Sequence, residues 1–256
     1  MNRYITECYS LSNNGNNQGK VFHKYILGVY DLYERLISKF PYILFESCSS
    51  GGARFDPGIL YYAPQTWTSD DSDAIERLKI QYGTSYVYPI ISMGAHVSAI
   101  PNQQVGRTTP IETRANVAFF GAFGYELDLN LISDEEKEKV KQQVIFYKAH
   151  RELISKGIFY RISSPFDGNI TSWIVVSENK KEAIAGYYQV LNSVNEGWKR
   201  FYLVGLDSNK KYTINNDNNK IYYGDELMNA GIVVDKEEFC VKGKDFSSVL
   251  YYLTEL

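Results

Sequence analysis

The chain has 256 residues and a formal net charge of −3; 44% of its residues are hydrophobic and 22% are charged. This composition excludes a disordered chain and allows one large domain or two smaller ones, while the weak negative charge argues against nucleic-acid or anionic-membrane partners. The scattered Cys8, Cys48 and Cys240 indicate neither a disulfide framework nor a zinc ribbon, so a cytoplasmic location is the simplest expectation.

Helical and strand-like patterns alternate over the first 157 residues. Residues 6–20 are polar and predict an exposed loop. Apolar side chains then recur at helical spacing between Phe22 and Ile37, ahead of Pro41. Further helices are predicted over residues 73–82, 109–123 and 133–157. Short apolar runs between the helices predict strands at residues 42–45, 65–69, 87–93 and 125–129.

Helix-capping signals support these boundaries. Asp73 and Ser133 are each followed three residues later by a glutamate, which predicts two capping boxes. Thr109 precedes Pro110, which favours an N-cap followed by proline in the first helical position. Gly157 suits a helix C-cap.

Four alternations of strand and helix predict βα units around a parallel sheet. After Gly157, β-type runs separated by Asn, Gly and Asp turns predict an antiparallel β domain. These runs are residues 173–176, 184–191, 201–204, 212–214, 221–223 and 249–253. We therefore expect two domains, residues 1–157 and residues 158–256.

One stretch, residues 46–73, gathers the residue types of a binding site for a polar, ring-shaped ligand. Gly51 and Gly52 allow the backbone to approach a ligand closely or to adopt a positive φ. Trp67 offers an apolar face, and Asp70 is a candidate acid or base. The alternative is a glycine-rich turn followed by a strand and a helix cap, and composition alone favours that alternative.

Two motifs in this stretch are specific. Residues 48–56 (CSSGGARFD) and 67–70 (WTSD) resemble the galactose loop and the acid/base strand end of the bacterial α-galactosidases of glycoside hydrolase family 36, the melibiase and raffinose type. The resemblance continues in order through residues 73–79, 93–98 and 224–231. It implies an α/β fold, the second half of a (β/α)₈ barrel followed by a C-terminal antiparallel β-sandwich domain.

The resemblance also implies a reaction. It is the retaining hydrolysis of terminal α-galactosides such as melibiose and raffinose, with a small-molecule substrate, no metal or other cofactor, and a homo-oligomeric full-length enzyme. Asp70 corresponds to the proton donor, whose pKa the reaction requires to be raised. The residues that the resemblance assigns to galactose binding are Cys48, Gly51, Gly52, Trp67 and Asn2. The alternatives are a helix-start carboxylate for Asp70 and a buried apolar cysteine for Cys48.

The neighbouring polar residues have simpler expectations. We expect Asp73 to cap a helix and Asp71 to be solvated or to support the site. Arg54 and Asp56 are expected to pair and hold the loop, and His96 is expected to be a structural histidine at a strand end.

Ser50 and Ala53 stand where the family frequently has glycine. The more important departure is at Met1-Asn2-Arg3, which in the family directly follows the nucleophilic aspartate. This resemblance places the nucleophile immediately before Met1 and predicts that the 256-residue chain by itself does not hydrolyse α-galactosides. The rival hypothesis is a catalytically inactive galactose-binding or structural fragment.

Overall fold

The computed structural model describes residues 9–11, 18–195, 197–240 and 244–256. The chain divides into two compact units, unit 1 with Met1–Asp70 and Ser92–Gly94 and unit 2 with Asp71–Ile91 and Ala95–Leu256. Within the described ranges, no helix combines the length and the apolar character needed to cross a membrane.

Unit 1 contains two helices and two very short parallel strands. Helix α1 (Lys20–Lys39) confirms the predicted helix, and it ends where the Phe40 N–H donates to the Leu36 carbonyl at 2.8 Å. Helix α2 (Pro57–Tyr62) was not predicted, although Pro57 in its first turn follows the rule for helix starts. The two helices meet through the aromatic rings of Tyr30 and Tyr33, which lie 5.6 and 6.1 Å from the ring of Tyr62.

The predicted strand at residues 42–45 is wrong. Tyr42 and Leu44 are 99% and 90% exposed, and the paired residues follow them in β1 (Glu46–Ser47). The partner strand β2 (Gln65–Thr66) is equally short, so the prediction for residues 65–69 holds only for its first two residues. An apolar run can predict burial, but a strand also requires a hydrogen-bonded neighbour, which residues 46–47 and 65–66 find in each other.

The α/β part of unit 2 contains α3 (Ala74–Thr84), α4 (Ile111–Ala118), α5 (Asp134–Lys156) and the paired strands β3 (Gly94–Ser98) and β4 (Ala122–Glu126). The strand predicted at residues 87–93 is wrong, because that segment leads through a 3₁₀ turn (Ile90–Ser92) into β3. Small residues and a histidine begin β3, and these are weak strand formers. Strand β4 lies three residues before its predicted start, and α4 ends before the predicted residue 123.

Two of the three predicted N-caps are confirmed. The Asp73 carboxylate accepts from the Ile75 and Glu76 N–H groups, and Ser133 forms a complete capping box at the start of α5. Thr109 is not the N-cap of α4, because Pro110 is extended and itself occupies that position. Glu76 does not complete a box with Asp73, since its carboxylate pairs with basic side chains instead.

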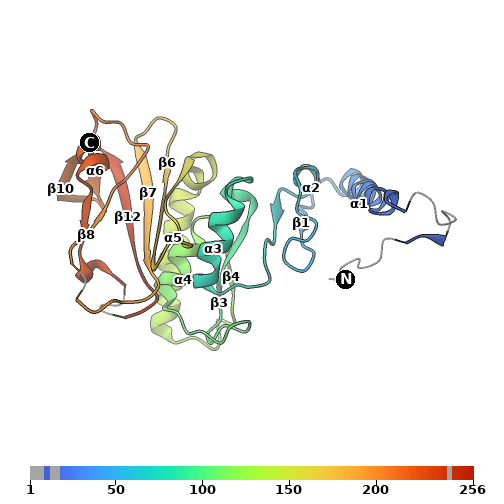
Figure 1. Cartoon of the computed structure of the whole chain (residues 1–256), viewed down its shortest axis with the longest axis horizontal. Helices are drawn as coiled ribbons and strands as arrows, with labels where there is room; N and C mark the ends of the chain where they lie inside the picture. Colours follow the sequence, from blue (N-terminus) through green and yellow to red (C-terminus); the bar gives the residue numbers. More distant parts are fainter. Residues whose placement is uncertain (1–8, 12–17, 196, 241–243) are drawn as a thin grey trace. The chain divides into compact units, whose positions relative to one another are not determined.

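The C-terminal part of unit 2 confirms the predicted antiparallel domain. A six-stranded sheet has the order β10-β9-β12-β7-β6-β5, and a two-stranded sheet, β11-β8, accompanies it. In Figure 1, α3, α4 and α5 lie on one side of β6, β7 and β12, and β8 and α6 lie on the other. The bounds are β5 Ile158–Ser163, β6 Ile170–Val176, β7 Glu182–Gln189, β8 Lys199–Phe201, β9 Lys211–Ile214, β10 Asp217–Tyr223, α6 Gly224–Asn229, β11 Ile232–Val234 and β12 Ser247–Glu255.

Both faces of the large sheet are buried. The side facing the small sheet contributes to an apolar cluster with Phe201 and Leu203. On the other side, Trp173 is fully buried, and its ring lies 5.5 Å from that of Phe120 and 5.0 Å from that of Tyr188. Two layers of packing therefore hold this sheet, as a sandwich requires.

Gly157 joins the last barrel helix to the first strand of the sheet. It is the C-cap of α5, as predicted, but its φ of −70° is not left-handed. Glycine is required for space, because an added Cβ would lie 2.5 Å from both the Leu153 carbonyl oxygen and Val175 Cγ1. The predicted domain boundary after residue 157 falls within unit 2 and stays a prediction.

Candidate functional site

The two predicted motifs follow two paired parallel strands. In unit 1, Glu46 pairs with Gln65 and Ser47 with Thr66, and the Trp67 N–H donates to the Ser47 carbonyl at 2.9 Å. Cys48 therefore begins directly after one strand and Trp67 directly after its neighbour. Carboxyl ends of adjacent parallel strands are where α/β proteins collect their functional side chains.

The loop after β1 has an unusual backbone. Ser50, Gly51 and Gly52 all have positive φ, at 46°, 73° and 92°. An added Cβ at Gly51 would lie 2.7 Å from both the backbone N of Asp70 and Cα of Ser69, and one at Gly52 would lie 3.1 Å from the Thr68 carbonyl oxygen. The positive φ predicted for the two glycines is confirmed, and the loop backbone approaches the backbone of residues 68–70, which follow β2.

Arg54 and Asp56 hold this loop separately. Arg54 donates to the Cys48 carbonyl at 3.0 Å and to the Tyr25 hydroxyl at 3.1 Å. Asp56 accepts from the Tyr30 hydroxyl at 2.6 Å and caps α2 through the Ile59 N–H. The expected pairing of Arg54 with Asp56 is wrong, because each side chain ties a different end of the loop to a helix.

The remaining predicted site residues differ in exposure. Asp70 is exposed, whereas Cys48 and Trp67 are half-buried, and Cys48 carries a free thiol. The Trp67 ring lies against Gly94, where an added Cβ would be 2.9 Å from Cε3. Asn2 lies outside the described residues. The structure thus brings together the Gly51-Gly52 loop and the segment from Trp67 to Asp70.

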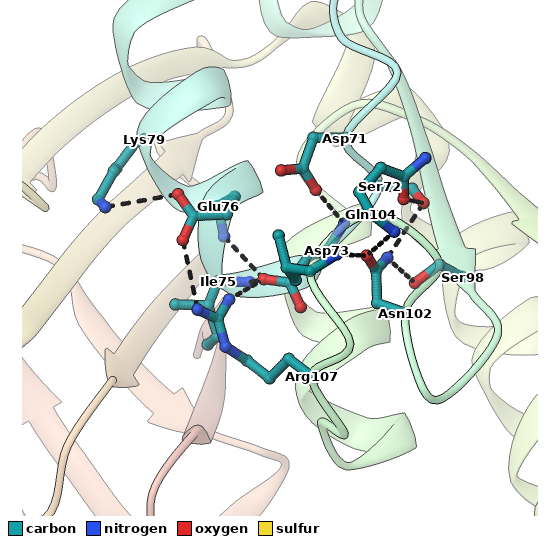
Figure 2. Close-up of polar contacts among 11 residues, drawn as sticks. Asp71, Ser72, Asp73, Ile75, Glu76, Lys79, Ser98, Asn102, Gln104 and Arg107 are labelled. Atoms are coloured by element: carbon teal, nitrogen blue, oxygen red, sulfur yellow. Dashed lines mark hydrogen bonds and ion pairs between the residues drawn. The ribbon is translucent and has the colours of Figure 1, made fainter.

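The residues after Asp70 form a polar cluster in unit 2, shown in Figure 2. The Asp73 N–H donates to the Asp71 carboxylate at 3.0 Å. Arg107 reaches from the loop before α4 and pairs with Asp73, which is only 1% exposed, and with Glu76 at 3.4 Å. Asp73 therefore has two roles, as a helix cap and as an ion-pair partner, and Asp71 supports it through the backbone.

Asn102 organises the loop that carries Arg107. It is 3% exposed, and its side-chain oxygen accepts from the Gln104 and Val105 N–H groups at 2.9 and 3.1 Å. Its backbone N–H donates to the Arg107 carbonyl at 2.8 Å. These bonds close a compact turn that fixes where Arg107 meets α3.

His96 lies in the middle of β3 and not at its end. It is packed against Gly124, where an added Cβ would lie 2.8 Å from His96 Nε2. Burial lowers the pKa of His96, and the charge of Arg77 lowers it further. Burial also lowers the pKa of Arg77 to about 10, against the opposing effect of the Asp71 and Glu126 carboxylates. A neutral, packed histidine agrees with the expected structural role.

A sequence model of the family described as Melibiase matches residues 1–157, and one described as the glycosyl hydrolase family 36 C-terminal domain matches residues 170–253. The chain belongs to the melibiase family.

Named relatives agree with this membership. The chain is 50% identical over 253 residues to the α-galactosidase AgaA of Geobacillus stearothermophilus, covering 99% of the chain and 34% of that protein. It is 44% identical over 251 residues to the α-galactosidase Mel36A of Lactobacillus acidophilus, covering 97% and 34%. The chain thus spans about a third of the length of these curated relatives.

Solved structures of the melibiase family match the whole chain. An AgaA variant in complex with raffinose has a TM-score of 0.93 at 49% identity, and the α-galactosidase of Lactobacillus brevis has 0.91 at 54%. Each match covers 100% of this chain and 35% of the other. These matches confirm the predicted fold class, part of a (β/α)₈ barrel followed by an antiparallel β-sandwich.

Sequence reasoning missed the support for the site. Arg107 lies 34 residues from Asp73, and nothing in the polar loop around it predicts an ion pair. Asn102 sits in the same loop, and its burial was not expected. The one available signal was the dense run of carboxylates at Asp70, Asp71 and Asp73, which favours a basic partner nearby.

Proposed function

We propose that this chain forms part of a retaining α-galactosidase in which Asp70 is the acid/base residue. The observation that carries the proposal is the packing of the Gly51 backbone against the backbone of Ser69 and Asp70. That packing supports a single site made from the galactose-loop motif and the acid/base motif. The proposed substrates are small α-galactosides of the raffinose and melibiose type.

Each residue has a proposed task. Asp70 protonates the leaving oxygen in the first step and activates water in the second. Its counterpart is a carboxylate about 5 Å away that forms the glycosyl-enzyme. Cys48, Trp67 and the backbone of Gly51 and Gly52 contact the galactose ring. Asn2, beside the proposed nucleophile, contacts a sugar hydroxyl.

The assembly and location are also proposals. Exposed apolar residues such as Tyr42, Leu44 and Tyr61, which are 80–99% exposed, support association of the full-length protein into a homo-oligomer. Cys48 and Cys240 are free thiols, which supports the cytoplasmic location.

A chimera tests the function. Residues 1–256 would replace the aligned third of AgaA, and hydrolysis of raffinose and of p-nitrophenyl α-galactoside would be measured. Asp70→Asn should lower raffinose hydrolysis by about 10²–10⁴-fold, the range for one general acid/base group. The first step on the nitrophenyl substrate should change less, because its leaving group needs no proton. Asp167→Asn, the same change at an exposed aspartate, is the control.

Azide sharpens the assignment. It attacks the anomeric carbon without a general base while the nucleophilic carboxylate leaves, so with the nitrophenyl substrate it should speed the second step of Asp70→Asn and give α-galactosyl azide. Equal, small losses on both substrates would show that Asp70 is not the acid/base. A chimera that folds and binds galactose but stays inactive would favour the non-catalytic rival.

A further inference from the structure

A cavity of about 350 Å³ opens in the C-terminal part of unit 2. It lies between the small β11-β8 sheet and the outer strands β9 and β10 of the large sheet. Its floor is apolar, formed by Ile214, Ile232 and Tyr251, which are at most 8% exposed. The volume falls within the range of roughly 300–1,000 Å³ typical of small-molecule sites. None of its lining residues comes from the residue 46–73 stretch.

Trp198 stands at the mouth of this cavity. Its side chain is 87% exposed, whereas Trp173 in the same unit is fully buried. An indole ring has a large apolar face and a single N–H donor, so it suits a ligand that has both an apolar face and hydroxyl groups. A flat ring beside an open cavity matches the apolar C–H face of a pyranose.

Arg200 is held in position beside it. Arg200 Nη1 donates to the Ala230 carbonyl at 2.8 Å and lies 3.5 Å from that of Gly231. Gly231 has a φ of 73°, and an added Cβ would lie 2.9 Å from the Phe201 carbonyl oxygen, so this turn accepts only glycine without strain. The backbone thus orients the guanidinium and spares its other N–H groups for a ligand.

The opposite wall offers acceptors. Glu238 pairs with Lys220 and also accepts from the Tyr251 hydroxyl at 2.9 Å. The charged lining side chains that the structure describes are two cations and three carboxylates, which gives the cavity lining a formal net charge of −1. They are Arg200, Lys220, Glu226, Asp235 and Glu238. This balance disfavours an anion such as phosphate, whereas sugar hydroxyls both donate and accept and can use both kinds of group.

We propose that this cavity is a binding site for a neutral oligosaccharide, with one pyranose stacked on Trp198 and its hydroxyls bound by Arg200 and Glu238. The cavity contains none of the residues proposed for the chemistry at Asp70, and its proposed ligand binding does not depend on that chemistry. It gives the C-terminal domain a ligand of its own.

Raffinose binding to the 256-residue chain tests this site. Isothermal titration would be done with 1-deoxygalactonojirimycin at saturation, since this iminosugar occupies AgaA in a solved structure and should fill a galactose site. We expect raffinose binding to persist under these conditions. Trp198→Ala should weaken it at least about tenfold, the effect of losing one stacking surface. Trp198→Phe should retain most of it. Phe166→Ala, at a 65% exposed aromatic outside the cavity, should leave it unchanged.

Three results would overturn the proposal. The first is loss of all raffinose binding in the iminosugar. The second is unchanged binding in Trp198→Ala. The third is that the original chain does not bind raffinose and that Trp198→Ala changes the oligomeric state, measured by light scattering. This face would then be an interface between copies of the chain. An unchanged melting temperature of Trp198→Ala would show that weaker binding is not unfolding. None of these outcomes depends on the Asp70→Asn experiment.

Discussion

Unit 1 and the six-stranded sheet of unit 2 are stabilised in different ways. Strands β1 and β2 pair through two residues each, and α1 has no buried residue. In the sheet, β12 pairs with β7 over the whole of residues 247–254, and apolar residues such as Ile174 and Leu253 are fully buried. The sheet has an extensive apolar core, whereas unit 1 has a few buried side chains such as Ile59, aromatic contacts between its two helices, and close backbone contacts.

The geometry of the candidate site in unit 1 depends on local contacts of its loop. The Gly51-Gly52 loop is positioned by glycines against the Asp70 backbone and by side-chain bonds from Arg54 and Asp56. Stability and site geometry therefore depend on different residues. Substitutions should separate the two, and four predictions test this, in order of expected effect.

The largest effect belongs to the sheet core. Trp173→Ala should lower the free energy of unfolding by about 3–5 kcal/mol, because it removes a fully buried ring and leaves a cavity. Trp198→Ala, the same change at an 87% exposed position, should stay within about 0.5 kcal/mol. Chemical denaturation of both variants measures the difference. Equal losses would mean that Trp173 lies outside the cooperative core.

The second effect belongs to the loop. Gly51→Ala places a side chain at a positive φ and 2.7 Å from backbone atoms, which should cost about 2–4 kcal/mol of local strain. In the AgaA chimera it should lower activity about 10²-fold by displacing the segment from Trp67 to Asp70. The free energy of unfolding of the six-stranded sheet should stay unchanged. Gly106→Ala has a similar φ of 69° but open space around it, so its activity should be nearly normal. Similar losses in both variants would contradict the role of the contact.

The third effect belongs to the ion pair between Arg107 and Asp73. Arg107→Ala leaves the buried Asp73 carboxylate without its ion-pair partner, at a cost of about 1–3 kcal/mol, reduced from a fully buried pair because Arg107 is partly exposed. Arg107→Lys keeps the charge but not the fork that also reaches Glu76, so it should recover only part of the loss. Thermal denaturation in low and high salt measures both. Full recovery by lysine would rule out the bridging geometry.

The smallest effect is a pH dependence. The folded pKa of His96 is lowered by burial and by Arg77, so below its ordinary value of 6.5 the unfolded chain binds the proton first. Stability should therefore fall as pH drops below about 6.5, down to the folded pKa. Burial lowers the pKa of His150 as well, so each of His96→Gln and His150→Gln should flatten the curve in part. If stability depends on pH equally steeply in His96→Gln and in the original chain, His96 does not contribute to the pH dependence.

The sequence predicted helices well and barrel strands poorly. Helix α1 has apolar side chains at helical spacing, and α3 and α5 begin after the caps Asp73 and Ser133; both kinds of signal are local. Residues 42–45 and 87–93 are apolar without being strands, because pairing depends on distant neighbours. Most of the antiparallel runs were easier to predict, since turns bracket them. The run predicted at residues 201–204 is wrong except for Phe201, where β8 ends, and β5 and β11 were missed.

The candidate site was predictable only in part. The motifs around Cys48 and Asp70 are each contiguous in sequence, and Gly51 and Gly52 allow the positive φ that the loop adopts. The partners of those motifs are not contiguous: Tyr25 and Tyr30 come from α1, and Arg107 from a loop far along the chain. Long-range partners of this kind leave no pattern in a single sequence.

The junction at Gly157 bears on how such enzymes can be recombined. Helix α5 passes into strand β5 through the single residue Gly157, where a side chain would clash. The two parts are therefore joined without a linker at this point. A β domain exchanged between relatives at this residue would need glycine at the junction, because any side chain there would clash with the Leu153 carbonyl and with Val175.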